Sequence, residues 1–194
     1  LTDTIAILLG NGYRVGAFRL ADDKEIMGIN DKVQLSQANE VMKQKIIRRH
    51  MLEGVTFLNP DSTYISPETK MAPDTVIYPG TLLEGACEIG CGTVIGPNTH
   101  LIRVKVGEGS VVENSVLRDS VVGNNTNVGP FAYVRPGSTI GSGVKVGDFV
   151  EVKNSVIGDE TKISHLTYVG DSDVGEKVNF GCGTVTVNYD GREK

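Results

Sequence analysis

Three side chains in the C-terminal half of the chain are the first candidates for chemistry. His165 carries an imidazole, a group that titrates at about pH 6.5 in water and can act as a general base. Arg135 and Lys153 each follow an aliphatic residue and stand 18 positions apart. If they stack on one face, the two cations repel each other unless an anion lies between them, which predicts a phosphate site. Taken singly, each residue is also compatible with an ordinary surface position.

An internal repeat indicates the elements that must position these side chains. Aliphatic residues recur at every sixth position through most of residues 65–186, and a glycine often follows them. A period of six fits neither an amphipathic helix nor a simple hairpin stack, and it is typical of a parallel β-solenoid. Glycine, asparagine and aspartate suit the left-handed turns of such a fold. The repeat positions are Ile65, Met71, Ile77, Leu83, Ile89, Ile95 and Leu101, then Val106 and Val112, then Val122, Val128, Val134, Ile140, Val146 and Val152, then Ile157, Ile163 and Val169, and finally Val174, Phe180 and Thr186.

The chain divides near Asn59-Pro60, where its composition changes. Residues 1–59 contain 5 of the 24 glycines, and residues 60–194 contain the other 19. The elements expected in the first part are a helix over Thr2–Leu9, a strand over Tyr13–Leu20 and a long helix over Asp31–Glu53. The expected apolar face of the long helix comprises Leu35, Ala38, Met42 and Ile46.

Charge and composition exclude several classes of protein. The chain has 19 basic and 24 acidic side chains and a formal net charge of −5, whereas a dedicated nucleic-acid binder needs a basic face. No apolar stretch approaches the roughly 18 residues of a membrane span, so neither a nucleic acid nor a membrane is an expected partner. Three cysteines without disulfide or zinc spacing favour a cytoplasmic location. Because the chain starts at Leu1 and ends inside the repeat, we expect a piece of a longer protein.

The repeat resembles that of the hexapeptide-repeat acyltransferases, in which three hexads form one triangular coil of a left-handed parallel β-helix. Within that superfamily, the chain is similar to the GlmU family, whose members combine glucosamine-1-phosphate N-acetyltransferase and N-acetylglucosamine-1-phosphate uridylyltransferase activities. The resemblance implies a mainly β fold and a homotrimer with active sites between neighbouring β-helices. The matching segments are GINDKVQLSQANEV (Gly28 to Val41), GPFAYVRPGS (Gly129 to Ser138), VGDFVEVKNS (Val146 to Ser155), HLTYVGDSDVG (His165 to Gly175) and VNFGCGTVTVNYDG (Val178 to Gly191).

The same resemblance implies a domain organisation. Residues 1–30 correspond to the C-terminal end of a nucleotidyltransferase domain, residues 31–59 to a linker helix region, and residues 60–194 to a truncated β-helix acetyltransferase domain. The nucleotidyltransferase half of the family uses UTP and Mg²⁺, and Asn30 matches a residue that helps to bind the metal. The glycine-rich loop and the metal-binding aspartate of that site are absent from this sequence.

For the acetyltransferase half, the resemblance implies a role for each matching residue. His165 is the general base that takes a proton from the amine of glucosamine 1-phosphate. Arg135 and Lys153 bind the phosphate of this sugar, and a spacing of one coil fits that role. Tyr168 and Asn179 hold the sugar by hydrogen bonds, although a surface tyrosine and a turn asparagine are the simpler alternatives.

The acetyl donor implied by the resemblance is acetyl-CoA. Asn188 and Tyr189 match residues that contact it, and Cys182 matches one that does so through its backbone. The family more often has alanine at the position of Cys182. We do not expect a nucleophilic role for this thiol, because direct transfer to the amine needs no acyl-enzyme and no histidine precedes it at a telling spacing.

Three other functions use the same architecture. A γ-type carbonic anhydrase needs three histidines around a zinc ion, and the repeat offers only His100 and His165. A non-catalytic trimerisation scaffold would tolerate replacement of His165. A nucleotidyltransferase with a purely regulatory β-helix would bind no sugar phosphate at Arg135 and Lys153.

Overall fold

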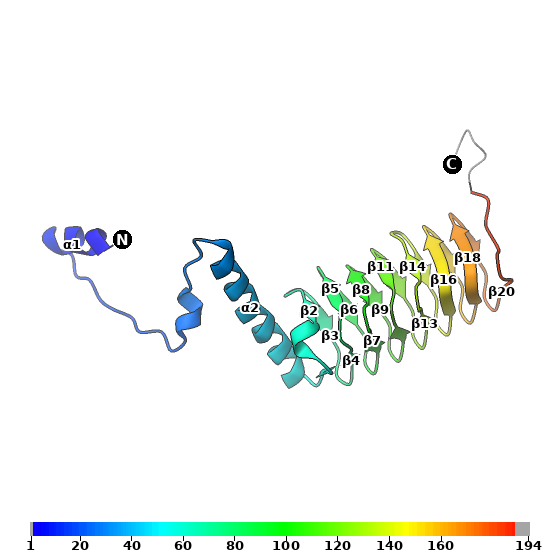
Figure 1. Ribbon diagram of the computed structural model, residues 1–194, viewed down its shortest axis with the longest axis horizontal. Helices are drawn as coiled ribbons and strands as arrows, with labels where there is room; N and C mark the ends of the chain where they lie inside the picture. The colour runs from blue at the N-terminus through cyan, green and yellow to red at the C-terminus, as the bar shows by residue number, and fades with distance from the viewer. Residues whose placement is uncertain (1, 189–194) are drawn as a thin grey trace. The chain divides into compact units, whose positions relative to one another are not determined.

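The computed structural model describes residues 2–188 of a chain that forms two units, residues 1–41 and residues 42–194. The first unit contains α1 (Thr2–Gly10), η1 (Asp23–Ile26) and the start of α2 (Lys32–Leu52), which confirms both predicted helices (Figure 1). The strand predicted over 13–20 is wrong. This segment pairs with no strand among residues 2–188, and the Phe18 side chain is 88% exposed. An apolar pattern becomes a strand only where a neighbour satisfies its backbone groups.

The second half of α2 packs on the first coil of the repeat through a face that agrees with the predicted one only in part. Ile46 is buried as predicted. Met42 is exposed, and the buried side chains are those of Lys43, Ile46, Ile47 and His50. The ammonium of Lys43 donates a hydrogen bond to the carbonyl oxygen of Asp61 at 3.0 Å. This contact compensates the burial of the lysine. A polar residue therefore lies on the buried face because the solenoid end offers it a carbonyl oxygen.

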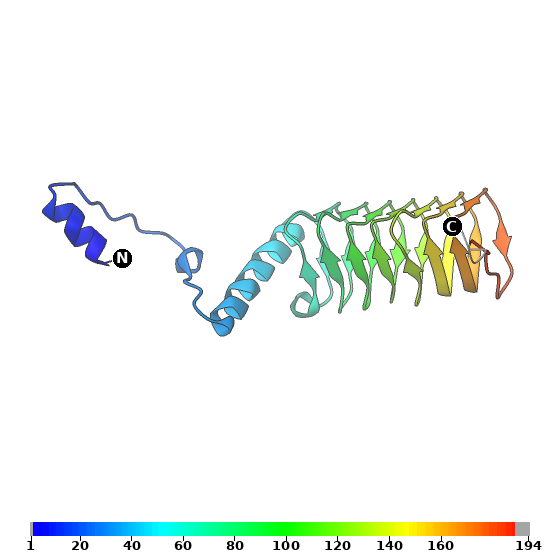
Figure 2. The same ribbon diagram turned by 90° about the horizontal axis from the view of Figure 1, so that it is seen from above.

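Residues 56–180 form a parallel β-helix whose short strands stack in three columns. The first column contains β1 (Thr56–Phe57), β4 (Val76–Ile77), β7 (Val94–Ile95), β10 (Val111–Val112), β13 (Asn127–Val128), the first parts of β16 (Lys145–Lys153) and β18 (Lys162–Gly170), and β20 (Asn179–Phe180). The second contains β2 (Tyr64–Ile65), β5 (Leu82–Glu84), β8 (His100–Ile102), β11 (Val116–Arg118), β14 (Tyr133–Val134) and the last parts of β16 and β18. The third contains β3 (Lys70–Met71), β6 (Glu88–Ile89), β9 (Lys105–Val106), β12 (Val121–Val122), β15 (Thr139–Ile140), β17 (Val156–Ile157) and β19 (Asp173–Val174). A short η2 (Pro60–Ser62) joins β1 to β2, and Figure 2 shows the coils stacked in chain order.

The predicted hexad positions form the core of this β-helix. Each one from Ile65 to Val169 is buried, whereas Val174 and Phe180, on the last described coil, are only partly buried. Leu117 completes the second column between Leu101 and Val134, although it breaks the six-residue spacing that the sequence pattern follows. The spacing changes because the coil from Leu101 to Leu117 is shorter, while the stacking of inward side chains continues.

A second inward ladder consists of threonines and serines that the hydrophobic pattern did not reveal. Several of their hydroxyls donate to carbonyl oxygens of the next coil, as Thr93 does to Gly107 at 2.8 Å and Thr126 to Gly141 at 2.7 Å. Others donate to a nearby carbonyl oxygen on the same coil, as Ser115 does to Glu113 at 2.7 Å. Both threonines are fully buried. The hydroxyls of Thr93 and Thr126 are hydrogen-bonded, so their burial leaves no unpaired group, whereas the buried Oγ atom of Ser120 has no hydrogen-bond partner among residues 2–188.

Close contact between coils explains one glycine beside the candidate site. A Cβ atom at Gly147 would collide with the carbonyl oxygen of Ser164 on the next coil. Any side chain here would push β16 and β18 apart.

Among residues 2–188, no helix is both long and apolar enough to cross a bilayer.

Candidate active site on the C-terminal coils

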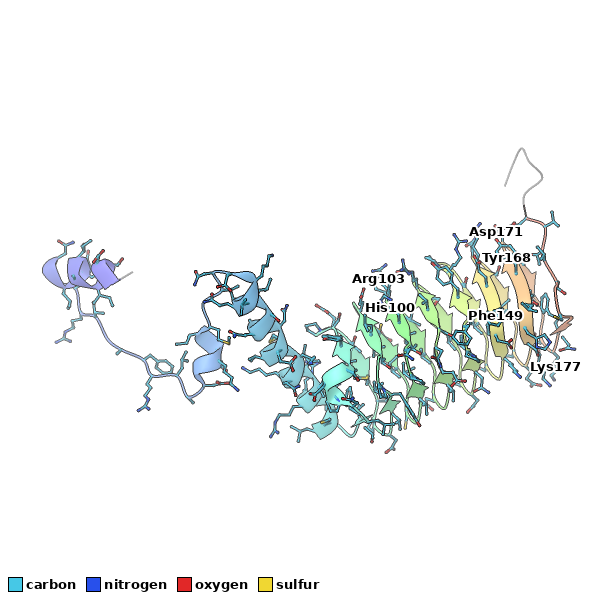
Figure 3. The ribbon with its side chains drawn as sticks, in the orientation of Figure 1. His100, Arg103, Phe149, Tyr168, Asp171 and Lys177 are labelled. Carbon is cyan, nitrogen blue, oxygen red and sulfur yellow. The ribbon has the colours of Figure 1, made fainter. Side chains whose placement is uncertain are left out.

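The C-terminal coils hold most of the residues that were singled out for chemistry. The valines that precede Arg135 and Lys153 are in-register neighbours on β14 and β16, so the two cations lie on one face in adjacent coils. Tyr168 follows on β18, in register with Glu151 of β16. Figure 3 shows Tyr168 and Asp171 close together at this end of the β-helix.

Arg135 already has an anionic partner within the chain. Its Nη1 atom donates to the Oε1 atom of Glu151 at 2.9 Å, and this hydrogen bond raises the pKa of the guanidinium above its ordinary value. Glu151 lies in register between Tyr133 and Tyr168. The argument that the stacked cations need an external anion is therefore wrong as stated. The chain's own carboxylates relieve the repulsion, although a guanidinium keeps further donors for a ligand.

Lys153 belongs to a denser polar cluster around Asp171. Its ammonium donates to the Asp171 carboxylate at 3.1 Å, and Asn154 donates to the same carboxylate at 2.8 Å. The amide of Asn188 donates to this carboxylate as well, and to the Tyr168 hydroxyl oxygen at 3.2 Å. Hydrogen bonds from Asn154, Lys153 and Asn188 lower the pKa of Asp171 to about 2.

One glycine makes room for this cluster. A Cβ atom at Gly170 would collide with the hydroxyl of Tyr168 and crowd the amide of Asn188. Because glycine leaves this space open, the tyrosine and asparagine side chains can meet above β18. Two residues that resemblance assigned to different substrates are thus in direct contact.

His165 lies on β18, in register with Asp148 on β16. Its Nδ1 atom is 4.0 Å from Oδ1 of Asp148, which is an ion-pair distance when the imidazole is protonated but too long for a hydrogen bond. The His165 side chain is 51% exposed, so a substrate amine can reach it. Cys182 stands 17 residues later, and the pairing of β18 with the following coil uses the same offset. The statement that no histidine precedes Cys182 at a telling spacing is therefore wrong.

A ridge of exposed apolar side chains runs beside His165. It consists of Phe131, Phe149 and Leu166, which are 56–60% exposed. All three have a left-handed backbone, with φ of 58°, 55° and 47°. The two phenylalanine rings stack with centroids 5.6 Å apart. Bulky residues adopt this conformation at an energetic cost, and backbone strain of this kind concentrates at functional sites.

The structure does not join every predicted residue to this cluster. Asn179 lies exposed on β20 in register with Lys162, and Cys182 is exposed on the same last coil. Tyr189 lies outside the described residues. Neither Asn179 nor Cys182 forms a side-chain hydrogen bond with the polar cluster around Asp171 among residues 2–188.

Asn30 belongs to the other unit and lies in an exposed segment. Its backbone N–H donates to Oε1 of Gln34 at 2.6 Å. Among residues 2–188, no three histidine, cysteine, aspartate or glutamate side chains come together as a metal site would require. A single amide oxygen does not fit Mg²⁺, which takes six oxygen ligands in octahedral geometry.

Sequence reasoning missed Glu151, Asp171, Asp148 and Asn154. Glu151 and Asp171 follow the cations they contact by 16 and 18 residues, which is about one coil. A search for opposite charges at that spacing would have found both. Asn154 is also about one coil from its partner, 17 residues before Asp171, but it is uncharged and a search for opposite charges would not have found it.

Comparisons with known proteins agree with the repeat and extend beyond it. Residues 119–154 match the family model described as bacterial transferase hexapeptide (six repeats). The chain is 55% identical to the bifunctional protein GlmU of Acetivibrio thermocellus and 51% identical to that of Brevibacillus brevis. Both matches cover all 194 residues of the chain but 42% of each relative, so the chain spans about two fifths of their length.

A solved structure shows the same fold. A histidine-to-alanine mutant of GDP-perosamine N-acetyl transferase from Caulobacter crescentus, in complex with CoA and GDP-perosamine, superposes with a TM-score of 0.50. The match covers 77% of this chain and 63% of that chain at 19% identity. The predicted fold, a left-handed parallel β-helix of hexapeptide repeats, is confirmed.

Proposed function

The whole chain is a relative of the bifunctional GlmU proteins over part of their length, and from that premise we propose that it transfers the acetyl group of acetyl-CoA to glucosamine 1-phosphate. The observation that carries the proposal is the placement of an exposed imidazole and two cations on neighbouring coils. His165, Arg135 and Lys153 all lie on the segment from β14 to β18. A base and an anion-binding face on adjacent coils suit an amino sugar that carries a phosphate.

The proposed reaction is a direct transfer. His165 accepts a proton from the ammonium form of the sugar, and the free amine attacks the thioester carbonyl carbon. A C–N bond forms and the C–S bond breaks. The sulfur leaves as CoA thiolate. As the amide forms, the nitrogen loses a second proton, and this proton converts the thiolate into the free CoA thiol. Arg135 and Lys153 hold the phosphate through N–H donors, with Tyr168 and Asn179 on the sugar hydroxyls.

The acetyl donor is placed at the end of the chain in this proposal. Cys182 through its backbone, Asn188 and Tyr189 are the residues assigned to acetyl-CoA. The support is that Asn188 already touches Tyr168 and the carboxylate that holds Lys153. The longer protein would trimerise and would use UTP and Mg²⁺ to convert the product into UDP-N-acetylglucosamine, with Asn30 at the edge of that second site.

An acetyl-transfer assay tests the proposal. The chain is mixed with glucosamine 1-phosphate and acetyl-CoA, the free CoA thiol is followed, and the product is identified by mass. Turnover with formation of N-acetylglucosamine 1-phosphate is the expected result. Silence from this chain and from a longer protein that continues the repeat would overturn the acetyltransferase assignment and favour a scaffold.

Arg135→Gln is expected to raise the KM for glucosamine 1-phosphate roughly tenfold, because charge-assisted hydrogen bonds to the phosphate are lost. The KM for acetyl-CoA should stay within about twofold. Arg103→Gln is the matched control, since Arg103 is also an exposed, ion-paired arginine but lies on earlier coils. Steady-state kinetics with both substrates varied measure the effect, and an equal change in the two variants would contradict a phosphate role for Arg135.

A further inference from the structure

We propose that Asp171 is a positioning residue that aligns the sugar-phosphate half of the site with the acetyl-CoA half. The inference rests on the proposed function and adds a residue to which that function assigned no role. Three side chains meet at this one carboxylate: Lys153, Asn154 and Asn188. Two of them belong to different halves of the site, the phosphate half and the acetyl-CoA half.

The backbone fixes Asp171 in place before its side chain acts. Its N–H donates to the carbonyl oxygen of Lys153 at 2.9 Å, and its φ of 50° places it at a left-handed corner. Aspartate tolerates this conformation better than most residues. The corner aims the carboxylate back toward the coil that carries Lys153, so backbone and side chain both hold that coil.

The contacts of the Asp171 carboxylate set the direction of the Lys153 ammonium in one half of the site and the position of the Asn188 amide in the other. An ammonium has three N–H donors, and one of them points to Asp171, so its direction is set while the others stay available to a phosphate. The Asn188 amide donates both to Asp171 and to the Tyr168 hydroxyl, which places the last described residue over β18. A shift of Lys153 or of Asn188 is therefore transmitted to the other residue through the Asp171 carboxylate.

Asparagine cannot replace the carboxylate in this position. All three neighbours are donors, and an ionised carboxylate is an acceptor on both oxygens. An asparagine has one acceptor oxygen and would turn an NH₂ group toward at least one donor. With its pKa near 2, the carboxylate of Asp171 remains charged throughout any practical assay range, so its acceptor role does not depend on pH there.

The chain contains a matched control at the same corner on an earlier coil. Asp119 also has a left-handed backbone, with φ of 41°, and its N–H donates to the carbonyl oxygen of Ile102 at 2.9 Å. Its carboxylate holds Arg103 through two hydrogen bonds of 2.6 and 2.8 Å. Figure 3 shows Arg103 several coils away from Asp171. Asp119 thus shares the structural role without touching any proposed substrate residue.

The test compares Asp171→Asn with Asp119→Asn in the acetyl-transfer assay, with each substrate varied in turn. For Asp171→Asn we expect the KM for both substrates to rise about tenfold, because charge-assisted contacts that hold Lys153 and Asn188 are lost. For Asp119→Asn both KM values should stay within about twofold. The thermal unfolding midpoint should fall by a similar amount in both variants, since each loses one corner carboxylate.

A double variant asks separately whether Asp171 acts through Asn188. When Asp171 acts through Asn188, Asn188→Ala alone should raise the KM for acetyl-CoA, and adding Asp171→Asn should raise it little further. Unchanged KM values in Asp171→Asn, equal changes in Asp119→Asn, or simple additivity in the double variant would overturn the inference while the wild type remains active. Silence from this chain and from a longer protein that continues the repeat would overturn the proposed function and the inference together.

Discussion

Replacing His165 with alanine is expected to lower the rate of acetyl transfer by about 10²- to 10⁴-fold, the usual contribution of a positioned general base. The side chain is 51% exposed and has no hydrogen bond to another side chain among residues 2–188, so its removal leaves no buried polar group unpaired in that part of the chain. The loss should therefore appear in kcat while the thermal unfolding midpoint stays unchanged. Release of free CoA at saturating substrate concentrations measures kcat, and circular dichroism measures the unfolding midpoint.

His100→Ala is the control for this experiment. His100 also lies next to a carboxylate, with its Nε2 atom 3.1 Å from Oε1 of Glu84, but on β8 rather than β18. Its replacement should leave turnover within about twofold of wild type. Retained turnover in His165→Ala would remove the histidine from the chemistry and leave the β-helix as a scaffold or a regulatory module.

Leu101→Ala is expected to destabilise the β-helix by about 2–5 kcal/mol, the usual cost of truncating a fully buried leucine. Leu101 has no exposed surface and stacks between Leu83 and Leu117 in the second column. The cavity left by the shorter side chain cannot close easily, because hydrogen bonds between coils fix their spacing. Denaturant unfolding followed by far-ultraviolet circular dichroism measures the change.

Ile102→Ala supplies the comparison from the next position in the same strand. Ile102 faces outward and is only partly buried, so we expect its truncation to cost about 1 kcal/mol or less. The two substitutions compare an inward with an outward side chain in the same strand of the same coil. Equal losses from the two substitutions would show that the column of inward side chains is not the stabilising core.

The fold was predictable because every coil repeats the same physical requirement. One aliphatic side chain per hexad must face inward, and from Ile65 to Val169 each predicted position is buried. Local patterns also sufficed for α1 and α2, whose ends carry glycines. The expected strand over 13–20 failed because strand formation depends on a partner that a local pattern does not reveal.

The buried face of α2 shows a second limit of pattern reading. Apolar periodicity correctly selected Ile46 but also selected Met42, which is exposed. It missed the buried side chains of Lys43, Ile47 and His50. Lys43 is buried because its ammonium reaches the carbonyl oxygen of Asp61, 18 residues away. A helix that covers the end of a solenoid meets backbone carbonyls as well as side chains, so a lysine can be satisfied there.

The sequence alone determined the repeat and the inward aliphatic positions of its hexads, since these depend on residue type and spacing, and with the family resemblance it proposed the candidate residues His165, Arg135 and Lys153. Only the tertiary structure decided what surrounds them. It placed Glu151 on Arg135 and Asp171 on Lys153, and it joined Asn188 to Tyr168. The physical reason is that coil stacking sets which residues 16 to 20 positions apart become neighbours, and small changes in coil length shift that register. Residue type and spacing therefore proposed candidate residues, and coil stacking determined their electrostatic partners.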